Sequence, residues 1–118
     1  MLIEERAREL GRLIGQSDEY RAVVRANEAL QGDAEAVALL REMDALQREA
    51  QSIVARGEEP GEDMERRLDE LLARVQANAS YQRLAVAQEN LDKTMHRVNE
   101  WIGEGITKGA QSSIITLG

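Results

Sequence analysis

The chain has 118 residues, no cysteine and a formal net charge of −7 at pH 7. These values predict one domain and exclude disulfides, thiolate metal sites, cysteine-ligated iron–sulfur clusters and cysteine nucleophiles. No segment is basic, so we expect no direct binding of nucleic acid or of an anionic membrane, although a basic partner could reach RNA. The charged N-terminus and the lack of a long apolar run lead us to expect a cytoplasmic protein.

The composition favours thin seams between helices over a thick globular core. Apolar residues make up 42% of the chain, but aromatic residues make up only 3%. Aromatic side chains usually supply much of the buried area of a globular core. Aliphatic side chains must replace them here, which suits contacts between helices.

The first two helices are predicted from their apolar spacing and caps. The first covers about residues 3–14, and Gly15 can end it in the left-handed conformation. Its apolar side comprises Leu2, Leu10, Leu13 and Ile14. Ser17 is a suitable N-cap for a second helix that Gly32 ends, and Asp33 can cap the next.

A three-four rhythm of apolar residues predicts a long third helix over about residues 34–56. One apolar row comprises Ala36, Leu40, Met43, Ala50 and Val54, and an adjoining row comprises Leu39, Leu46 and Ile53. So wide a stripe contacts two neighbours, as in a helical bundle. A break around Pro60 precedes a fourth helix over about residues 62–77, and the two helices should form an antiparallel hairpin.

A fifth helix is predicted from about Tyr81 to Ile102 or Ile106. In the preceding break, Asn78 suits the end of one helix and Ser80 suits the cap of another. The sequence leaves open whether the fourth and fifth helices are continuous. The fold class expected is all-α, with a helical hairpin and a long C-terminal helix packed beside it in a bundle-like arrangement.

Residues 107–118 are predicted to form a C-terminal tail after a single helical domain of residues 1–106. Glycines at 103, 105 and 109 weaken helix, and residues 110–113 are typical of a flexible connector. The apolar Ile114, Ile115 and Leu117 would cost free energy in water. We expect them to dock into a groove of a second copy or to add a strand to a neighbour, an incidental contact being the alternative.

No pattern identifies a catalytic residue, and we expect no enzymatic activity, cofactor or metal site. His96 is the only histidine and has Asp92 and Glu100 one helical turn away on either side. A di-iron helix would need glutamate at the position of Lys93, so an exposed pair between histidine and a carboxylate is the simpler interpretation.

Two further sets of polar residues have open interpretations. Acidic side chains cluster at Glu58, Glu59, Glu62, Asp63 and Glu65. They could face a basic partner, although a solvated loop and a first helical turn that favours carboxylates is the simpler explanation. Gln47 and Gln88 occupy positions in the apolar rows. They could pair across helices or lie in water where the bundle opens to solvent.

The apolar stripes exceed what one copy can cover, so we expect a homo-oligomer that also binds other proteins. The candidate interaction residues are Met64, Leu68, Leu71, Leu91, Met95, Ile114, Ile115 and Leu117.

Four features in order give the chain a family resemblance. They are Ser17-Asp18-Glu19-Tyr20, the Gln47 region of a long helix, the break from Gly57 to Pro60, and Asn78-Ala79-Ser80-Tyr81 before a final long helix. Over roughly residues 2–106 this order resembles the YlbF/YmcA (Com_YlbF) family of small bacterial helical proteins.

The resemblance implies a cytoplasmic, self-associating regulator without an active site. Relatives act in competence, biofilm formation and sporulation, and some join a complex that influences RNA processing by a membrane-anchored endoribonuclease. Some members of that complex carry iron–sulfur clusters on cysteines, which this chain lacks, so cluster binding does not carry over. The expected function is a non-enzymatic adaptor, and the alternative is a chaperone-like coiled-coil protein that clasps an apolar client segment.

Overall fold

The computed structural model describes residues 2–117, and the side chains from residue 2 to residue 111. Within that range the chain forms five α-helices and no strand, which confirms the predicted all-α class. The helices are α1 (Leu2–Gly15), α2 (Asp18–Gln31), α3 (Ala34–Ala55), α4 (Glu62–Ala77) and α5 (Ala79–Leu117).

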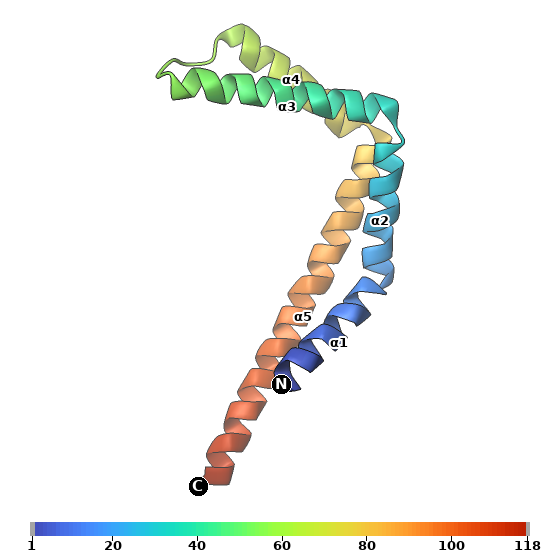
Figure 1. Cartoon of the computed structure of the whole chain (residues 1–118), viewed down its shortest axis with the longest axis vertical. Helices are drawn as coiled ribbons and strands as arrows, with labels where there is room; N and C mark the ends of the chain where they lie inside the picture. The colour runs from blue at the N-terminus through green and yellow to red at the C-terminus, as the bar shows by residue number, and fades with distance from the viewer. Residues whose placement is uncertain (1, 118) are drawn as a thin grey trace.

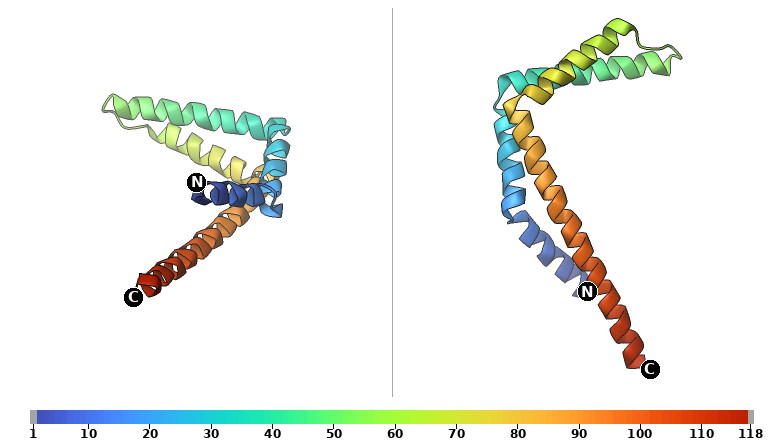
Figure 2. Two further views of the ribbon diagram at one scale, coloured as in Figure 1. Left: turned by 60° about the horizontal axis from the view of Figure 1, so that its bottom comes forward. Right: turned by 180° about the vertical axis from the view of Figure 1, so that it is seen from behind.

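The helices form two pairs that diverge from one junction (Figure 1). α3 and α4 form the expected antiparallel hairpin, whereas α5 packs along α2 and meets α4 only near the junction. The position expected for α5 beside the hairpin is therefore wrong. The molecule measures 69 × 37 × 23 Å with a radius of gyration of 21.9 Å, against roughly 13 Å for a compact chain of this length. The right view of Figure 2 shows the same elongation from behind.

Side chains at the helix ends explain why most predicted boundaries are correct. The Ser17 hydroxyl accepts a hydrogen bond from the Tyr20 N–H at 3.2 Å and thereby caps α2. At the end of α3, Gly57 has φ +82°, its N–H donates to the Val54 carbonyl at 2.9 Å, and the next N–H donates to the Ile53 carbonyl at 3.1 Å. This is a Schellman motif, which needs a residue that tolerates left-handed φ. Gly15, for which that conformation was predicted, is instead the last residue of α1.

The core of the hairpin lies on the second of the two predicted rows of α3. Leu39 and Leu46 are buried there against Leu71 and Val75 of α4. The side chains packed around them are Leu40, Met43, Met64, Leu68 and Tyr81. Val54, at the end of the first row, is 59% exposed because it lies beyond this contact.

The seam between α2 and α5 is built largely from small residues. Ala87 and Val98 of α5 are buried, and Leu30 is the buried residue of α2. Partly buried alanines, Ala22 and Ala26, recur one turn apart on α2. Small side chains at this spacing let two helix backbones approach closely, so the seam is narrow and buries little area.

The fifth helix differs from its prediction at both ends. It begins at Ala79, and it continues without a break to Leu117, across the predicted domain boundary at residue 106. The expected connector at residues 110–113 is therefore helical. Each glycine costs only about 1 kcal/mol in a helix interior, and extending an existing helix needs no new nucleation. The predicted docking of Ile114, Ile115 and Leu117 concerns side chains outside the described range.

The junction between the two helix pairs is held by Asp33. One carboxylate oxygen accepts from the Ala36 N–H at 3.1 Å and caps α3. The other accepts from the Ser80 hydroxyl at 2.9 Å and from the Asn78 side-chain amide at 3.3 Å. Asn78, rather than Ser80, caps α5 by accepting from the Tyr81 N–H at 3.0 Å. Asp33 therefore ties the turn between α2 and α3 to the turn between α4 and α5.

The first prediction tests the core of the hairpin. Leu71→Asp should lower the free energy of unfolding by about 3 kcal/mol or more, because it buries a charge without a partner. Glu59→Ala is the control and should change it by less than about 0.5 kcal/mol, since this loop side chain is exposed. Chemical denaturation measures both values, and equal shifts would contradict the assigned core.

The second prediction tests the junction through pH. The hydrogen bonds from the Ala36 N–H and then from Ser80 lower the pKa of Asp33 below its ordinary value of 3.8. The ionised group therefore stabilises the fold above the unfolded pKa, and this contribution disappears as pH falls through the folded pKa. Asp33→Asn should lower the melting temperature at pH 7, and the difference from the unaltered protein should shrink below about pH 4.

Asp69→Asn is the matched control for this titration, because Asp69 is exposed on α4. Its melting temperature should follow that of the unaltered protein at every pH. A difference between the Asp33 variant and the unaltered protein that stays constant from pH 7 to pH 3 would show that the carboxylate charge does not hold the junction.

Candidate interaction surface

The distal part of α5 projects beyond the rest of the molecule (Figure 1). Every described side chain from residue 99 to residue 111 is exposed. Among them Trp101 is 60% exposed, Ile102 46% and Ile106 68%. Short isolated helices are marginal in water, and the glycines of this segment weaken helix further. A partner that covers these apolar side chains would stabilise the projecting segment.

The first helix adds a second uncovered apolar surface at the same end of the molecule (Figure 1). α1 has no buried residue and contacts chiefly α2. Leu2, Ile3 and Leu13 expose 61% to 74% of their surface. We call the exposed apolar side chains of α1 and distal α5 the open end; it comprises Leu2, Ile3, Leu13, Trp101, Ile102 and Ile106.

The total surface of the chain shows how incomplete its packing is. The accessible area is 9256 Å², whereas a compact monomer of 13.2 kDa would expose roughly 6,400 Å². No large side chain is fully buried among the residues described. Excess area with exposed large apolar side chains is typical of a protein that buries part of its surface against a partner.

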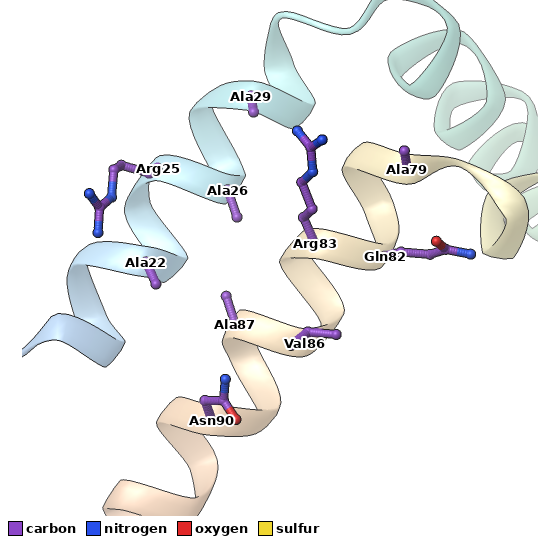
Figure 3. A pocket seen from close by; sticks show the side chains of 10 residues that line it. All are labelled: Ala22, Arg25, Ala26, Ala29, Ala79, Gln82, Arg83, Val86, Ala87 and Asn90. Carbon is purple, nitrogen blue, oxygen red and sulfur yellow. The ribbon is translucent and has the colours of Figure 1, made fainter.

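An open groove of about 630 Å³ runs between α2 and α5. Figure 3 shows that its floor is formed by small side chains of both helices. The apolar lining comprises Ala22, Ala26, Ala29, Ala79, Val86 and Ala87. Arg25 and Arg83 are its only charged lining residues, and Arg83 lies between the two helices in Figure 3. The groove is therefore apolar and cationic on a chain whose net charge is −7.

The predicted interaction residues lie in separate places. Met64, Leu68 and Leu71 pack in the hairpin, and Leu71 is buried there. Leu91 and Met95 are partly buried on α5, far along the chain from that cluster. Ile114, Ile115 and Leu117 belong to the helical end of α5, outside the range of described side chains. The structure therefore does not gather these residues into one surface, and their role in binding remains a prediction.

Sequence reasoning overlooked the exposed apolar side chains of the open end and the groove. The sequence places Trp101 and Ile106 at the C-terminal end of a packed fifth helix, because the glycines after residue 102 suggest that the helix stops. A usable signal for the groove was present in α2, where Ala22, Ala26 and Ala29 repeat at helical spacing. Their small size marks a close approach of two helices.

The polar residues with open interpretations are exposed. His96 Nε2 lies 3.0 Å from Glu100 Oε1, as expected for an exposed helix pair. The Gln88 amide donates to the Asp92 carboxylate at 3.4 Å, and both Gln47 and Gln88 are exposed to water. Within residues 2–117 no three potential ligands gather as a metal site would require.

The acidic cluster spans the loop before α4 and the first turn of that helix. Glu62, Asp63 and Glu65 occupy the first turn, where carboxylates oppose the helix dipole. Two loose ion pairs, Arg56 with Glu58 and Arg66 with Asp63, are each 3.9 Å long. Over the same described range, no helix combines the length and the apolar character that a membrane crossing requires.

Comparisons with known proteins agree on a family. Residues 3–107 match the family model described as control of competence regulator ComK, YlbF/YmcA. A UPF0342 protein of Bacillus mycoides (strain KBAB4) is 29% identical over 100 residues, covering 85% of this chain and 86% of the relative.

A solved structure has the same fold. It is a chain from the crystal structure of Bacillus subtilis RicA in complex with RicF, which superposes with a TM-score of 0.81 and 20% identity. The match covers 92% of this chain and 96% of the other. The family model covers most of the helical chain described above, and the chain therefore belongs to the Com_YlbF (YlbF/YmcA) family.

Proposed function

We propose that this protein is a non-enzymatic regulatory adaptor that binds other proteins through its open end. The observation that carries the proposal is the set of large apolar side chains on α1 and distal α5 that the chain itself leaves uncovered. Exposed apolar patches of this kind mark protein interaction sites on soluble domains. The elongated shape places this end far from the hairpin, so each end can contact a different protein.

Family membership supports the regulatory part of the proposal. The family model is described by its control of the competence regulator ComK, and the similar solved structure contains RicA bound to RicF. A role in bacterial developmental regulation or in RNA processing is consistent with both. We propose that this chain likewise acts by joining a protein complex, with self-association as one of its contacts.

Affinity capture from a lysate of the native organism tests this function. The unaltered protein should retain a small, defined set of regulatory or RNA-processing proteins. A Leu13→Asp/Ile106→Asp double variant should lose them, because both side chains belong to the open end. Val54→Asp is the matched control: this side chain is similarly exposed, at 59%, but lies on the hairpin, and its partners should be retained.

Two outcomes of the capture experiment would contradict the adaptor. Recovery of many unrelated unfolded proteins would support a chaperone-like clasp instead. Equal recovery by the open-end variant and by the Val54 control would show that the open end does not bind the partners.

The third prediction concerns self-association. At tens of micromolar, about the range in which specific weak oligomers persist, the mass from sedimentation equilibrium should exceed the monomer mass of 13.2 kDa. The physical reason is the excess apolar area, which a second copy can cover. A monomer throughout that range would contradict self-association. It would not contradict the binding of other proteins, which the capture experiment tests.

A further inference from the structure

We propose that two copies pair through antiparallel α5 helices, with Trp101 of each copy filling the α2/α5 groove of the other. In this arrangement Val86 lies opposite Trp101, and Arg83 forms an ion pair with Glu104 of the second copy. The inference rests on the self-association proposed above and specifies its surface.

The groove and the projecting segment lie on one face of α5. Arg83 and Trp101 are separated by about five full helical turns, as are Val86 and Glu104. Arg83 and Trp101 therefore point in one direction and Val86 and Glu104 in another, and because the two directions differ by only about 60° the four side chains share one broad face of α5. The proximal part of this face lines the groove, and the distal part exposes Trp101 at 60%.

One antiparallel register matches both pairs at once. The two helices run in opposite directions, so when Arg83 lies opposite Glu104, a residue that follows Arg83 by a given number lies opposite the residue that precedes Glu104 by the same number. Val86 then lies opposite Trp101, and Asn90 lies opposite Arg97. A two-fold axis repeats each contact, so the surface is complementary to itself and closes as a dimer.

Charge and shape favour a second copy as the occupant. Within residues 2–111, neither Arg83 nor Glu104 has an oppositely charged group within 4.0 Å. The groove has a floor of alanines that leaves room for a large ring, and Trp101 is the only tryptophan of the chain. A tryptophan in an apolar pocket with an arginine at its edge is typical of an energetically dominant contact.

The pairing also accounts for the projecting helix. The described side chains of distal α5 from residue 99 to residue 111 are all exposed, and the antiparallel register lays this segment along the α2/α5 pair of the second copy. The C-terminal end of α5 then extends toward the partner's junction between α4 and α5. The segment that a single chain cannot stabilise is thus supported by the second copy.

Charge reversal tests this interface directly, and it is the fourth prediction. Arg83→Glu or Glu104→Arg should each weaken dimerisation by about tenfold or more, because two like-charge contacts replace two ion pairs. The double variant Arg83→Glu/Glu104→Arg should restore most of the affinity. Arg41→Glu, which reverses an exposed charge on α3, is the control and should leave the dissociation constant unchanged.

Sedimentation and fluorescence measure these effects on the full chain. Trp101 emission should move to longer wavelength on dilution, at the same concentrations at which the mass falls to that of the monomer. Circular dichroism confirms that every variant remains helical, so that loss of dimer is not loss of fold.

Engineered cysteines provide a second test. The chain has no cysteine of its own, so only the introduced thiols can react. A mixture of Asn90→Cys and Arg97→Cys proteins should be cross-linked by a short bifunctional maleimide. Gln88→Cys mixed with Arg97→Cys should not, because residue 88 lies on another side of α5.

The outcomes separate this interface from the proposed function. A dimer whose affinity is unaffected by both single charge reversals would overturn the interface but leave self-association standing. A monomer at every concentration would overturn both. If Arg83→Glu abolished the capture of another protein while the dimer persisted, the groove would hold that protein, and the proposal would be wrong.

Discussion

The shape of this molecule depends on one carboxylate at the junction of its two helix pairs. Asp33 caps α3 with one oxygen and holds Ser80 and Asn78 with the other. Contacts between the hairpin and the α2/α5 pair are otherwise confined to the region of this junction. The direction of the hairpin is therefore set by these oriented hydrogen bonds together with Tyr81 of α5, which packs against the hairpin core.

The narrow contacts between helices follow from the composition, and they leave the apolar side chains of the open end uncovered. With alanine in α2 and few aromatic residues, each helix pair buries only one narrow row of side chains. The opposite faces carry charge along most of their length, and α1 and distal α5 expose large apolar side chains as well. No described helix covers these side chains. This uncovered apolar area is the feature of the described chain that is suited to recognising another molecule.

The sequence predicts the local structure well because helix ends are decided by nearby residues. Ser17 caps the start of α2, while the cap of Asp33 on Ala36 and the turn at Gly57 bound α3, and each of these contacts is local in sequence. The end of α5 was missed because glycine lowers helix propensity without removing a hydrogen bond, unlike proline. The partner of α5 was missed too, since the apolar periodicity shows that a face is covered but not by which helix.

The candidate site could be predicted only in part for the same reason. Periodicity pointed to Leu71, which is buried in the hairpin, and to Leu91, which is partly buried, because buried and binding residues share one spacing on a helix. A buried residue differs from a binding residue only in whether another helix of the same chain covers it, and this depends on the whole fold. Trp101 shows the difference: its spacing continues that of Val98, yet Val98 is 6% exposed and Trp101 is 60% exposed. The covered part of α5 ends between these two positions, so the same apolar row passes from the interior of the chain to its exposed surface.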